Sequence, residues 1–600
     1  MTRSRNAPDE LPPALRSLWR TVKLGYQAEP RLLLFSFAMM FFTALPDALI
    51  ALWLKLLANG VIDHHRRTVI VATLGLCTSA VTTWFLMVVF NRVQRRFRDR
   101  VAIALESHVA RLQAMIPTIE HQERPEHVDR LAMLRDQVFT LDHLFMSLFN
   151  TLGWVVRLAI TIVLLASIHP ALIVLVIFAI PTVATAMWRP GVERAVEERS
   201  IGHNRLARHL FVLGSTAAPG KEVRTTGIGP GLAERRRAAW ERWYEPVADA
   251  RWATAGWHSA AWALFGAAYV GAIVFVASGL HAAAGSVLLV LAAGSRLSQY
   301  VGATVSELGF LRGFWLDASR RLTWLEDYSA AIDADASTPA PDRLADGINV
   351  EHVSFRYPGT ERLVLDDVSV HLPAGSVVAI VGENGAGKTT LVKLLCRLYA
   401  PTSGRIMIDD IDLASIPSDE WRERLAGAFQ DFFRFELRAQ DSVGLGDLDQ
   451  IDERPAVERA VGRAGAVDVV ERLAHGLDTQ LGPTWDEGVE VSYGQWQKLA
   501  LARGFMRDEP LVLVLDEPTS ALDAETEHAL FERYAQASRD GAASGRITVL
   551  VSHRFSTVRM ADLIVVLDGA RLVEVGSHEQ LMAAGGQYAE LFSIQAAAFR

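Results

Sequence analysis

The sequence predicts a multidomain protein in which an all-α region of six membrane-spanning helices precedes a soluble α/β domain. The chain has 600 residues, more than one hydrophobic core normally organises. Residues 1–330 contain six long apolar runs and 35 Lys and Arg against 25 Asp and Glu, whereas the remaining 270 residues contain 25 against 43. A basic, apolar part followed by an acidic part is typical of a membrane region joined to a soluble domain.

The cysteine content and the N-terminal segment argue against a disulfide-rich, zinc-binding or secreted protein. The two cysteines, Cys77 and Cys396, have no partner at metal or redox spacing, so we expect neither a disulfide framework nor a zinc site. The first thirty residues are polar and contain Pro and Arg, unlike a cleavable signal peptide. We therefore expect residues 1–30 to form a cytoplasmic segment ahead of the first span.

Six apolar stretches are long enough, or nearly so, to cross a bilayer, which takes about 20 helical residues. They lie near residues 32–54, 69–90, 144–168, 171–188, 258–280 and 283–305. Buried core helices of a large soluble protein are the alternative, but six runs with so few charges argue against it. We predict a transmembrane domain over residues 31–328.

The basic residues orient this domain. The segment after the second span begins with five arginines between residues 92 and 100, and such residues favour the cytoplasmic side. Two cytoplasmic connections, 91–143 and 189–257, have charged and apolar residues at helical spacing. The first predicts an arm of about 38 Å that turns near Pro117 and Pro125, and the second turns near residues 217–221. A soluble domain could push on these turns.

Several polar or aromatic side chains fall inside the predicted spans. Charges within a membrane are costly and usually face the bundle interior or a water-filled cavity. Two interpretations stay open: an internal ion pair that fixes helix packing, or a substrate cavity. The residues concerned are Asp47, Trp154, Arg157, Arg296, Gln299 and Tyr300.

A polar linker rich in Ala, Pro and Asp, residues 329–347, separates this region from the predicted α/β domain over residues 348–600. There the apolar run "SVVAIV" leads into "GENGAGKTTLVKLL", which predicts a strand, a glycine loop and a helix. Such a P-loop points backbone N–H groups at phosphates, while its lysine reaches the terminal phosphates and the following hydroxyl binds Mg²⁺. The residues expected to hold phosphate are Gly382, Glu383, Asn384, Gly385, Ala386, Gly387, Lys388, Thr389 and Thr390.

A second apolar strand, "PLVLVLDEP" at 510–518, ends in two carboxylates. Asp516 is placed to hold Mg²⁺ through water, and Glu517 is the candidate base for an attacking water. An ordinary acidic turn is the alternative, but it leaves the P-loop in the same domain without a catalytic partner.

With these motifs, the chain resembles the ABC transporters over essentially its whole length. The match includes Tyr357 in "FRYPG", Gln430 in "AFQDF", "SALD" at 520–523 and His553 in "VLVSHR". The resemblance implies ATP and Mg²⁺ as cofactors, adenine stacking by Tyr357, and Mg²⁺ sensing by Gln430. It further implies a γ-phosphate contact from His553 and a place for Asp523 at the seam between two such domains.

The family signature, usually L-S-G-G-Q, appears here as "VSYGQ" at 491–495. Ser492, Gly494 and Gln495 are retained, and Tyr493 replaces the first glycine. In the family this motif contacts the γ-phosphate held by a second domain. A tyrosine keeps its backbone N–H, so the contact survives if φ is negative, but positive φ would strain it. We interpret the motif as working.

The resemblance implies half of a dimeric exporter, with a second half-transporter, membrane lipid and a small-molecule substrate as partners and no nucleic acid. A homodimer is favoured and a heterodimer is possible. The predicted location is a bacterial-type inner membrane, with the nucleotide-binding domain in the cytoplasm. The primary prediction is ATP-driven export of an antibiotic, drug or other natural product. A lipid flippase, a modified-peptide exporter and a siderophore importer are alternatives of the same fold, and an ATP-gated channel is the alternative of another class.

Overall fold

The computed structural model describes residues 10–138, 141–311, 315–332, 334–517, 545–552 and 555–598. The chain divides into two compact units. The first contains Met1–Ala114 and Arg130–Asp327, and the second contains Met115–Asp129 and Tyr328–Arg600. The chain thus enters the second unit once, at residues 115–129, before it returns to complete the first.

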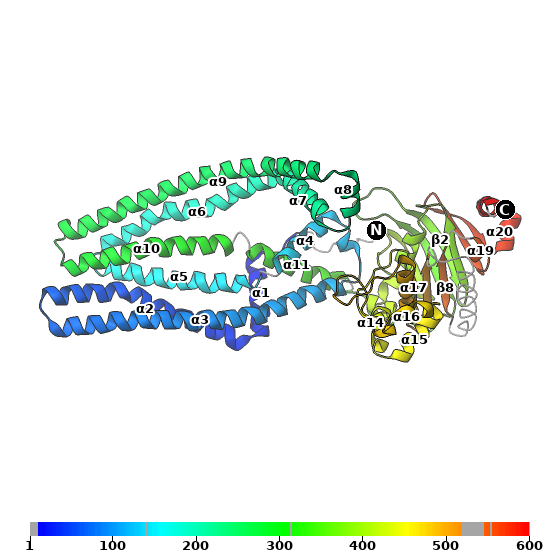
Figure 1. The fold of residues 1–600 in the computed structure, drawn as a ribbon, viewed down its shortest axis with the longest axis horizontal. Helices are drawn as coiled ribbons and strands as arrows, with labels where there is room; N and C mark the ends of the chain where they lie inside the picture. The colour runs from blue at the N-terminus through cyan, green and yellow to red at the C-terminus, as the bar shows by residue number, and fades with distance from the viewer. Residues whose placement is uncertain are drawn as a thin grey trace. The chain divides into compact units, whose positions relative to one another are not determined.

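The first unit is entirely helical. Long helices run alongside one another in Figure 1, and α10 lies against both α2 and α5 while α6 lies against α9. The helices are α1 (Ala14–Ala28), α2 (Pro30–Ile62), α3 (Arg66–Met115), α4 (Pro125–Val138), α5 (His143–Ala166), α6 (Val174–Arg199), α7 (Ile201–Ser215), α8 (Gly220–Thr226), α9 (Gly229–Val274), α10 (Ala284–Phe310) and α11 (Leu316–Ile332).

Among the residues that the structure describes, five helical segments are long and apolar enough to cross a membrane. They are Pro30–Ile62, Arg66–Met115, His143–Ala166, Pro170–Arg199 and Gly229–Gly279. They contain the first five predicted spans to within two residues, so a helical region with candidate spans is confirmed. The sixth predicted span, 283–305, is also a helix, α10, but Arg296 and Gln299 make it less apolar than the other five. Its crossing of the membrane stays a prediction.

Both predicted arms continue their membrane helices far beyond the apolar stretches. Helix α3 has 50 residues, and a short 3-10 turn (Glu120–Gln122) and α4 follow it. In the second arm, α7 ends at Ser215 and α8 begins at Gly220. The arms therefore turn where the prolines near 117–125 and the "AAPGK" stretch predict.

The second unit is an α/β domain with two sheets. A four-stranded antiparallel sheet has the order β2-β1-β4-β5, and a six-stranded sheet has the order β10-β9-β3-β8-β7-β6. The strands are β1 (Gly347–Phe355), β2 (Leu365–Pro373), β3 (Val377–Gly382), β4 (Ser403–Ile408), β5 (Ile411–Asp412), β6 (Leu425–Ala428), β7 (Val512–Asp516), β8 (Ile547–Val551), β9 (Leu563–Asp568) and β10 (Arg571–Gly576).

The helices of this unit are shorter. They are α12 (Lys388–Leu395), α13 (Ser418–Glu423), α14 (Ala439–Gly444), α15 (Arg454–Arg463), α16 (Val467–Arg472), α17 (Tyr493–Gly504), α19 (Phe555–Val558), α20 (His578–Ala584) and α21 (Gln587–Ala598). Strands β7 and β8 are buried at every residue, and they pair in parallel with each other. Uninterrupted apolar strands are typical of a parallel sheet that is covered on both faces.

Candidate functional site

Several of the predicted nucleotide-site residues lie at one edge of the six-stranded sheet. Strand β3 pairs in parallel with β8, β8 with β7, and β7 with β6, so their carboxyl ends share one side. Gly382 ends β3, Asp516 ends β7, and Gln430 lies two residues beyond the end of β6. Ligands of parallel sheets bind outside the carboxyl ends of the strands, so this edge is where a nucleotide site is expected.

Glycines shape the loop between β3 and α12. Gly382 and Gly387 have φ of 150° and 105°. A Cβ on Gly382 would lie 2.1 Å from the carbonyl oxygen of Leu567, and one on Gly387 would lie 2.7 Å from the carbonyl oxygen of Val364. Both positions therefore need glycine, because side chains are disfavoured by conformation and by space.

Lys388 begins α12 and folds back over the loop. Its Nζ donates hydrogen bonds to the carbonyl oxygens of Gly382 and Glu383, both at 2.9 Å. Burial lowers the pKa of the Lys388 ammonium, and the nearby carboxylates of Glu517 and Asp516 oppose that shift. The lysine is thus held in the centre of the loop, where a phosphate group would meet it.

Asp516 is buried, with 1% of its surface exposed. Burial raises the pKa of its carboxyl to about 6, a hydrogen bond with the Thr389 side chain lowers it, and the charge of Glu517 raises it further. Among the described residues its Oδ1 has no hydrogen-bond partner. A buried carboxylate oxygen without a partner, beside a threonine hydroxyl, fits Mg²⁺, which prefers oxygen ligands and shares its coordination with phosphate.

Glu517 follows Asp516 in a left-handed backbone conformation, with φ of 45°. This region is sparsely populated for residues other than glycine, and such strain often occurs at functional sites. The Gln430 side-chain amide donates a hydrogen bond to Glu517 Oε2 at 2.8 Å. The two side chains predicted to sense the metal and to activate water are therefore in direct contact.

A cavity of about 570 Å³ joins most of the predicted nucleotide residues. Its lining residues are Tyr357, Arg362, Leu363, Val364, Asn384, Gly385, Gly387, Lys388, Thr389, Thr390, Gln430, Glu517 and Ala570. Tyr357 is half-buried, and its hydroxyl lies 3.0 Å from the Thr390 hydroxyl. Its position at the cavity edge is compatible with the predicted base stacking.

The predicted signature forms the start of α17. Ser492 is the N-cap: its hydroxyl accepts a hydrogen bond from the Gln495 N–H at 3.3 Å, while the Gln495 side chain accepts one from the Ser492 N–H at 2.8 Å. This reciprocal arrangement is a capping box, and it fixes the start of the helix. None of Ser492–Gln495 lines the cavity of the same chain.

Tyr493 is the first residue of α17 and is not among the residues with positive φ. Its backbone therefore needs no glycine, which removes the objection to a tyrosine in the signature. Its side chain is 50% exposed and packs on Phe432, with ring centroids 5.3 Å apart, and the Arg434 guanidinium lies 5.5 Å from its ring centre. The ring thus packs on the segment that follows Gln430.

Arg503, near the other end of α17, was not predicted from the sequence. Its Nε donates to the Ser442 carbonyl oxygen at 2.8 Å, and its guanidinium lies 4.4 Å from the Phe435 ring centre. Burial lowers its pKa to about 10. Tyr493 and Arg503 together attach both ends of α17 to residues 432–442, and the aromatic run "DFFRFE" is the signal that could have indicated these contacts.

The tip of the first arm, residues 115–129, belongs to the second unit and contacts its α/β domain. The Tyr399 hydroxyl donates to the Glu123 carboxylate, and the Ile119 N–H donates to the Leu398 carbonyl oxygen at 3.3 Å. The Tyr399 ring lies edge-on to Tyr357, with centroids 5.5 Å apart. A continuous contact path therefore runs from the arm tip to the predicted base-stacking tyrosine. Glu123 and Tyr399 were not predicted, because their contact depends on the folded structure.

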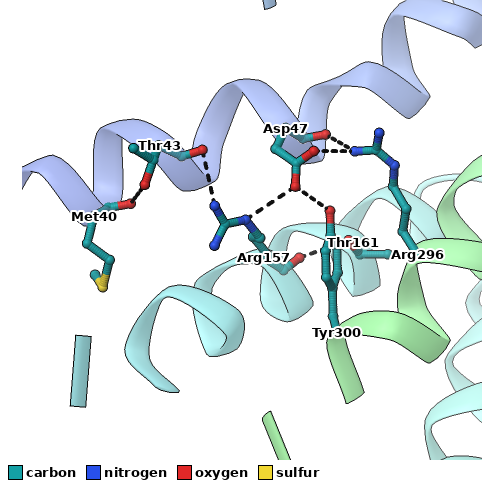
Figure 2. Close-up of polar contacts among 7 residues, drawn as sticks. All are labelled: Met40, Thr43, Asp47, Arg157, Thr161, Arg296 and Tyr300. Carbon is teal, nitrogen blue, oxygen red and sulfur yellow. Dashed lines mark hydrogen bonds and ion pairs between the residues drawn. The ribbon is translucent and has the colours of Figure 1, made fainter. Parts of the chain in front are cut away.

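In the membrane region, Asp47 lies at the centre of a polar network between α2, α5 and α10 (Figure 2). Its carboxylate contacts Arg296 Nη1 at 2.7 Å, the Tyr300 hydroxyl at 2.8 Å and Arg157 Nε at 3.2 Å. Trp154 packs on the Tyr300 ring at 5.8 Å and on the Arg157 guanidinium at 4.9 Å. This geometry supports the packing interpretation of the polar residues.

Gln299, the one remaining residue of the six proposed for a substrate cavity, is exposed on α10 and is not part of this network. A different cavity, of about 500 Å³, lies between α6, α9 and α10. It is lined by Thr182, Ala186, Arg189, Pro190, Glu193, Arg194, His258, Trp262, Val301, Gly302, Val305, Ser306, Gly309 and Phe310. No local pattern in the sequence marks this cavity, because its lining residues come from three separate helices.

Two predicted residues, His553 and Asp523, lie outside the described residues. The candidate site described here therefore includes only the other predicted residues. Their roles, and the residue limits of the predicted domains, stay predictions.

Comparison with known proteins agrees with this architecture. Residues 365–520 match the ABC transporter family. The chain is 38% identical over 269 residues to an ATP-dependent lipid A-core flippase of Pseudomonas aeruginosa, covering 45% of this chain and 43% of the relative. It is 43% identical over 256 residues to one from Ralstonia nicotianae, covering 42% of each. The chain thus matches less than half the length of these curated relatives.

The structure is similar to that of a bacterial Atm1-family ABC exporter with ATP bound, with a TM-score of 0.76 and 24% identity, covering 94% of this chain and 100% of the other. This likeness concerns the fold. Together with the candidate spans, the fold is compatible with the predicted multi-pass membrane protein, and its location in an inner membrane stays a prediction. Residues 365–520 are therefore an ABC transporter domain by sequence, within a chain that has the fold of the solved exporter and helices long and apolar enough to cross a membrane.

Proposed function

We propose that this chain is one half of a membrane exporter that hydrolyses ATP to move an amphipathic substrate out of the cytoplasm. The observation that carries the proposal is the convergence of Lys388, Thr389, Gln430 and Glu517 on one cavity, beside the buried Asp516. Phosphoryl transfer depends mostly on positioning and charge neutralisation, which this set of groups can supply.

In the proposed reaction, the loop backbone and Lys388 hold the ATP phosphates, and Glu517 orients and deprotonates the attacking water. Gln430, bonded to Glu517 at 2.8 Å, positions that carboxylate. Thr389, Asp516 and Gln430 would hold Mg²⁺, which neutralises phosphate charge when bound. Tyr357 at the cavity edge would stack on the adenine.

Dimerisation is part of this proposal. Ser492, Tyr493 and Gln495 form a rigid helix start, yet they do not line the cavity of their own chain. Free N–H groups and a capping serine at a helix N-terminus suit a phosphate. We propose that they contact the ATP held by a second chain, with an identical chain as the favoured partner.

For the substrate, we propose a lipid-like amphiphile ahead of the antibiotic or drug predicted first. The relatives named as lipid A-core flippases support the lipid alternative. The cavity between α6, α9 and α10 combines cationic Arg189 and Arg194 with the apolar surface of Trp262, which suits a molecule with an anionic group and an apolar body. Its volume of about 500 Å³ is also typical of drug-sized ligand sites, so drug efflux is kept as the second candidate.

The test measures ATP hydrolysis and substrate movement with the purified chain in lipid nanodiscs and proteoliposomes. Glu517→Gln should abolish ATP hydrolysis whether the lipid or the drug is the substrate. Translocation of a labelled lipid, or accumulation of a drug, then distinguishes the two substrate candidates. Hydrolysis that persists in the Glu517→Gln variant would contradict the catalytic assignment.

A cavity-filling variant tests the substrate site separately. Gly309 lines the cavity and has open space at its Cβ, so Gly309→Leu should fill the site and reduce substrate stimulation of the ATPase while basal hydrolysis persists. Gly256→Leu is the matched control, because Gly256 also has open space but lies on the exposed face of α9, away from the cavity. Equal effects of the two variants would argue against this cavity as the substrate site.

A further inference from the structure

One face of α3 is apolar and largely uncovered in its membrane-spanning half. Val81, Trp84, Phe85 and Val88 are 64–73% exposed and recur at three- and four-residue spacing. Only 11% of the most apolar stretch of α3 is buried, the lowest share among the five candidate spans. Side chains at this spacing form one stripe along a helix. This stripe therefore needs an apolar environment that the described part of the chain does not provide.

The same face becomes basic where the apolar stretch ends. Four arginines continue the helical spacing of the stripe, and all are exposed. Together with Asp99 and Ile103 they line a hollow of about 450 Å³; the arginines are Arg92, Arg95, Arg96 and Arg100. The remaining arginine of this run, Arg98, lies on another face of the helix and pairs with Asp142 at 3.2 Å. Of the five arginines in this run, Arg98 therefore forms an ion pair within the helical unit, and the other four form an exposed row.

The row keeps a net positive charge. Arg100 pairs with Glu29 at 3.1 Å, and Asp99 is the single acid within the row. Within the described ranges, no ion pair involves Arg92, Arg95 or Arg96. Four arginines against two acids leave two positive charges, in a position where a phosphate group could lie between exposed guanidiniums.

The depth of the row matches the lipid headgroups. At 1.5 Å per residue, Arg92 lies about 3 Å and Arg96 about 9 Å beyond Phe90, the last residue of the predicted apolar run. The headgroup layer of a bilayer is about 5–8 Å thick on each side. Helix α3 continues from there to residues 115–129, which belong to the unit that contains the ABC domain. The row therefore lies at the cytoplasmic surface of the membrane.

We propose that this face of α3 binds an anionic phospholipid of the cytoplasmic leaflet. Its phosphate pairs with Arg92, Arg95 and Arg96, and an acyl chain lies along the stripe from Val88 to Val81. A second copy of the chain is a poorer occupant, because a two-fold interface centred on this row would place like charges opposite each other. The inference is independent of the transported substrate and of ATP hydrolysis.

The test uses the full chain in nanodiscs of phosphatidylcholine, with or without phosphatidylglycerol. Native mass spectrometry measures which lipid stays bound after release. We expect preferential retention of phosphatidylglycerol, weakened by high salt. Combined Arg92→Gln, Arg95→Gln and Arg96→Gln should reduce this preference on the order of 100-fold, since each basic residue near an anionic surface contributes roughly fivefold.

Two further variants make the test specific. Combined Arg205→Gln, Arg208→Gln and Arg235→Gln removes the same charge from exposed positions of α7 and α9, well beyond the apolar stretches, and should keep the preference. Combined Arg92→Lys, Arg95→Lys and Arg96→Lys should also keep the preference. Unchanged retention in the glutamine triple variant would overturn the proposal. So would a photo-crosslinker at residue 95 that joins two chains rather than a lipid.

Discussion

The side-chain amide of Gln430 donates a hydrogen bond to the Glu517 carboxylate at 2.8 Å, across the ends of β6 and β7. The residue that follows β6 therefore fixes the carboxylate that follows β7. The contact makes the position of the proposed base depend on the segment that leads from Gln430 to the signature helix.

Glu517→Gln should lower the rate of ATP hydrolysis by at least 100-fold, because a general base typically contributes about 10²–10⁴-fold. Gln430→Ala should have a smaller effect, because it removes only the positioning hydrogen bond. Steady-state phosphate release, with ATP binding measured separately, checks both. Glu471→Gln, an exposed position on α16, is the charge-matched control and should hydrolyse ATP normally.

Tyr493→Phe should keep ATPase activity within about twofold, because the ring contact with Phe432 and Arg434 remains. Tyr493→Gly restores the usual family residue but removes that contact, and an aromatic pair contributes about 0.5–1.5 kcal/mol. We expect the glycine variant to unfold at a lower temperature without a gain in hydrolysis. A severalfold faster ATPase in Tyr493→Gly would show that the tyrosine impairs the signature.

Asp516 predicts a specific dependence of stability on pH. Its pKa is raised from 3.8 to about 6. Below about pH 4 the carboxyl is protonated in both the folded and the unfolded chain and does not affect stability. Above about pH 6 it is ionised in both, and its burial destabilises the folded chain by the full amount. The difference of about 2 pKa units corresponds to about 3 kcal/mol. Without nucleotide and Mg²⁺, Asp516→Asn should therefore unfold at a higher temperature than the native chain at pH 7 and at a similar temperature near pH 4.

Addition of ATP and Mg²⁺ should reverse this order. The native chain gains stability from ligand binding, whereas Asp516→Asn lacks the carboxylate that would hold the cation. Thermal unfolding at pH 7 with and without ligand measures both effects. If the variant gains as much as the native chain, Asp516 does not hold the metal.

Tyr399→Phe should weaken communication between the arm tip and the nucleotide site. The substitution removes the hydroxyl that donates to Glu123, while the ring that packs on Tyr357 remains. Substrate stimulation of the ATPase should fall, and the KM for ATP should stay within about twofold. Tyr588→Phe, which removes a hydroxyl 2.8 Å from His578 Nδ1, is the control and should leave stimulation intact. Unchanged stimulation in Tyr399→Phe would contradict the contact path.

Asp47→Asn should destabilise the membrane region, because Arg157 and Arg296 lose the carboxylate between them. Removal of one partner of a fully buried ion pair costs about 3–5 kcal/mol, and the loss should be smaller here because Asp47 and Arg296 are 23% and 27% exposed. Asp47→Asn combined with Arg296→Gln should recover part of that loss. Unfolding temperatures in nanodiscs compare these variants with Asp63→Asn, an exposed residue just beyond the same helix.

The parts of the fold and site that the sequence predicts are those that depend on consecutive residues. Gly382–Lys388 is one continuous loop, so its glycine spacing and the preceding apolar strand predict its conformation. The arms turn where proline and glycine interrupt helical patterns. The start of α17 follows from the Ser492 and Gln495 spacing of a capping box.

Contacts between distant residues could not be predicted in this way. Glu123 and Tyr399 are 276 residues apart, and no local pattern marks either. The separation of the arginine run into Arg98 and an outward row became visible only from the direction of the helix. The interpretation of Asp47 also needed the structure, because only the distances to Arg157, Arg296 and Tyr300 favour an internal network over an open cavity.

The left-handed backbone at Glu517 has a consequence for any search for more thermostable forms of this protein. Glycine and asparagine tolerate that conformation better than glutamate does, so Glu517→Gly or Glu517→Asn would relax the chain while removing the proposed base. A selection that rewards heat resistance alone would therefore enrich variants that lack the proposed base, and each round of such a selection must also score turnover.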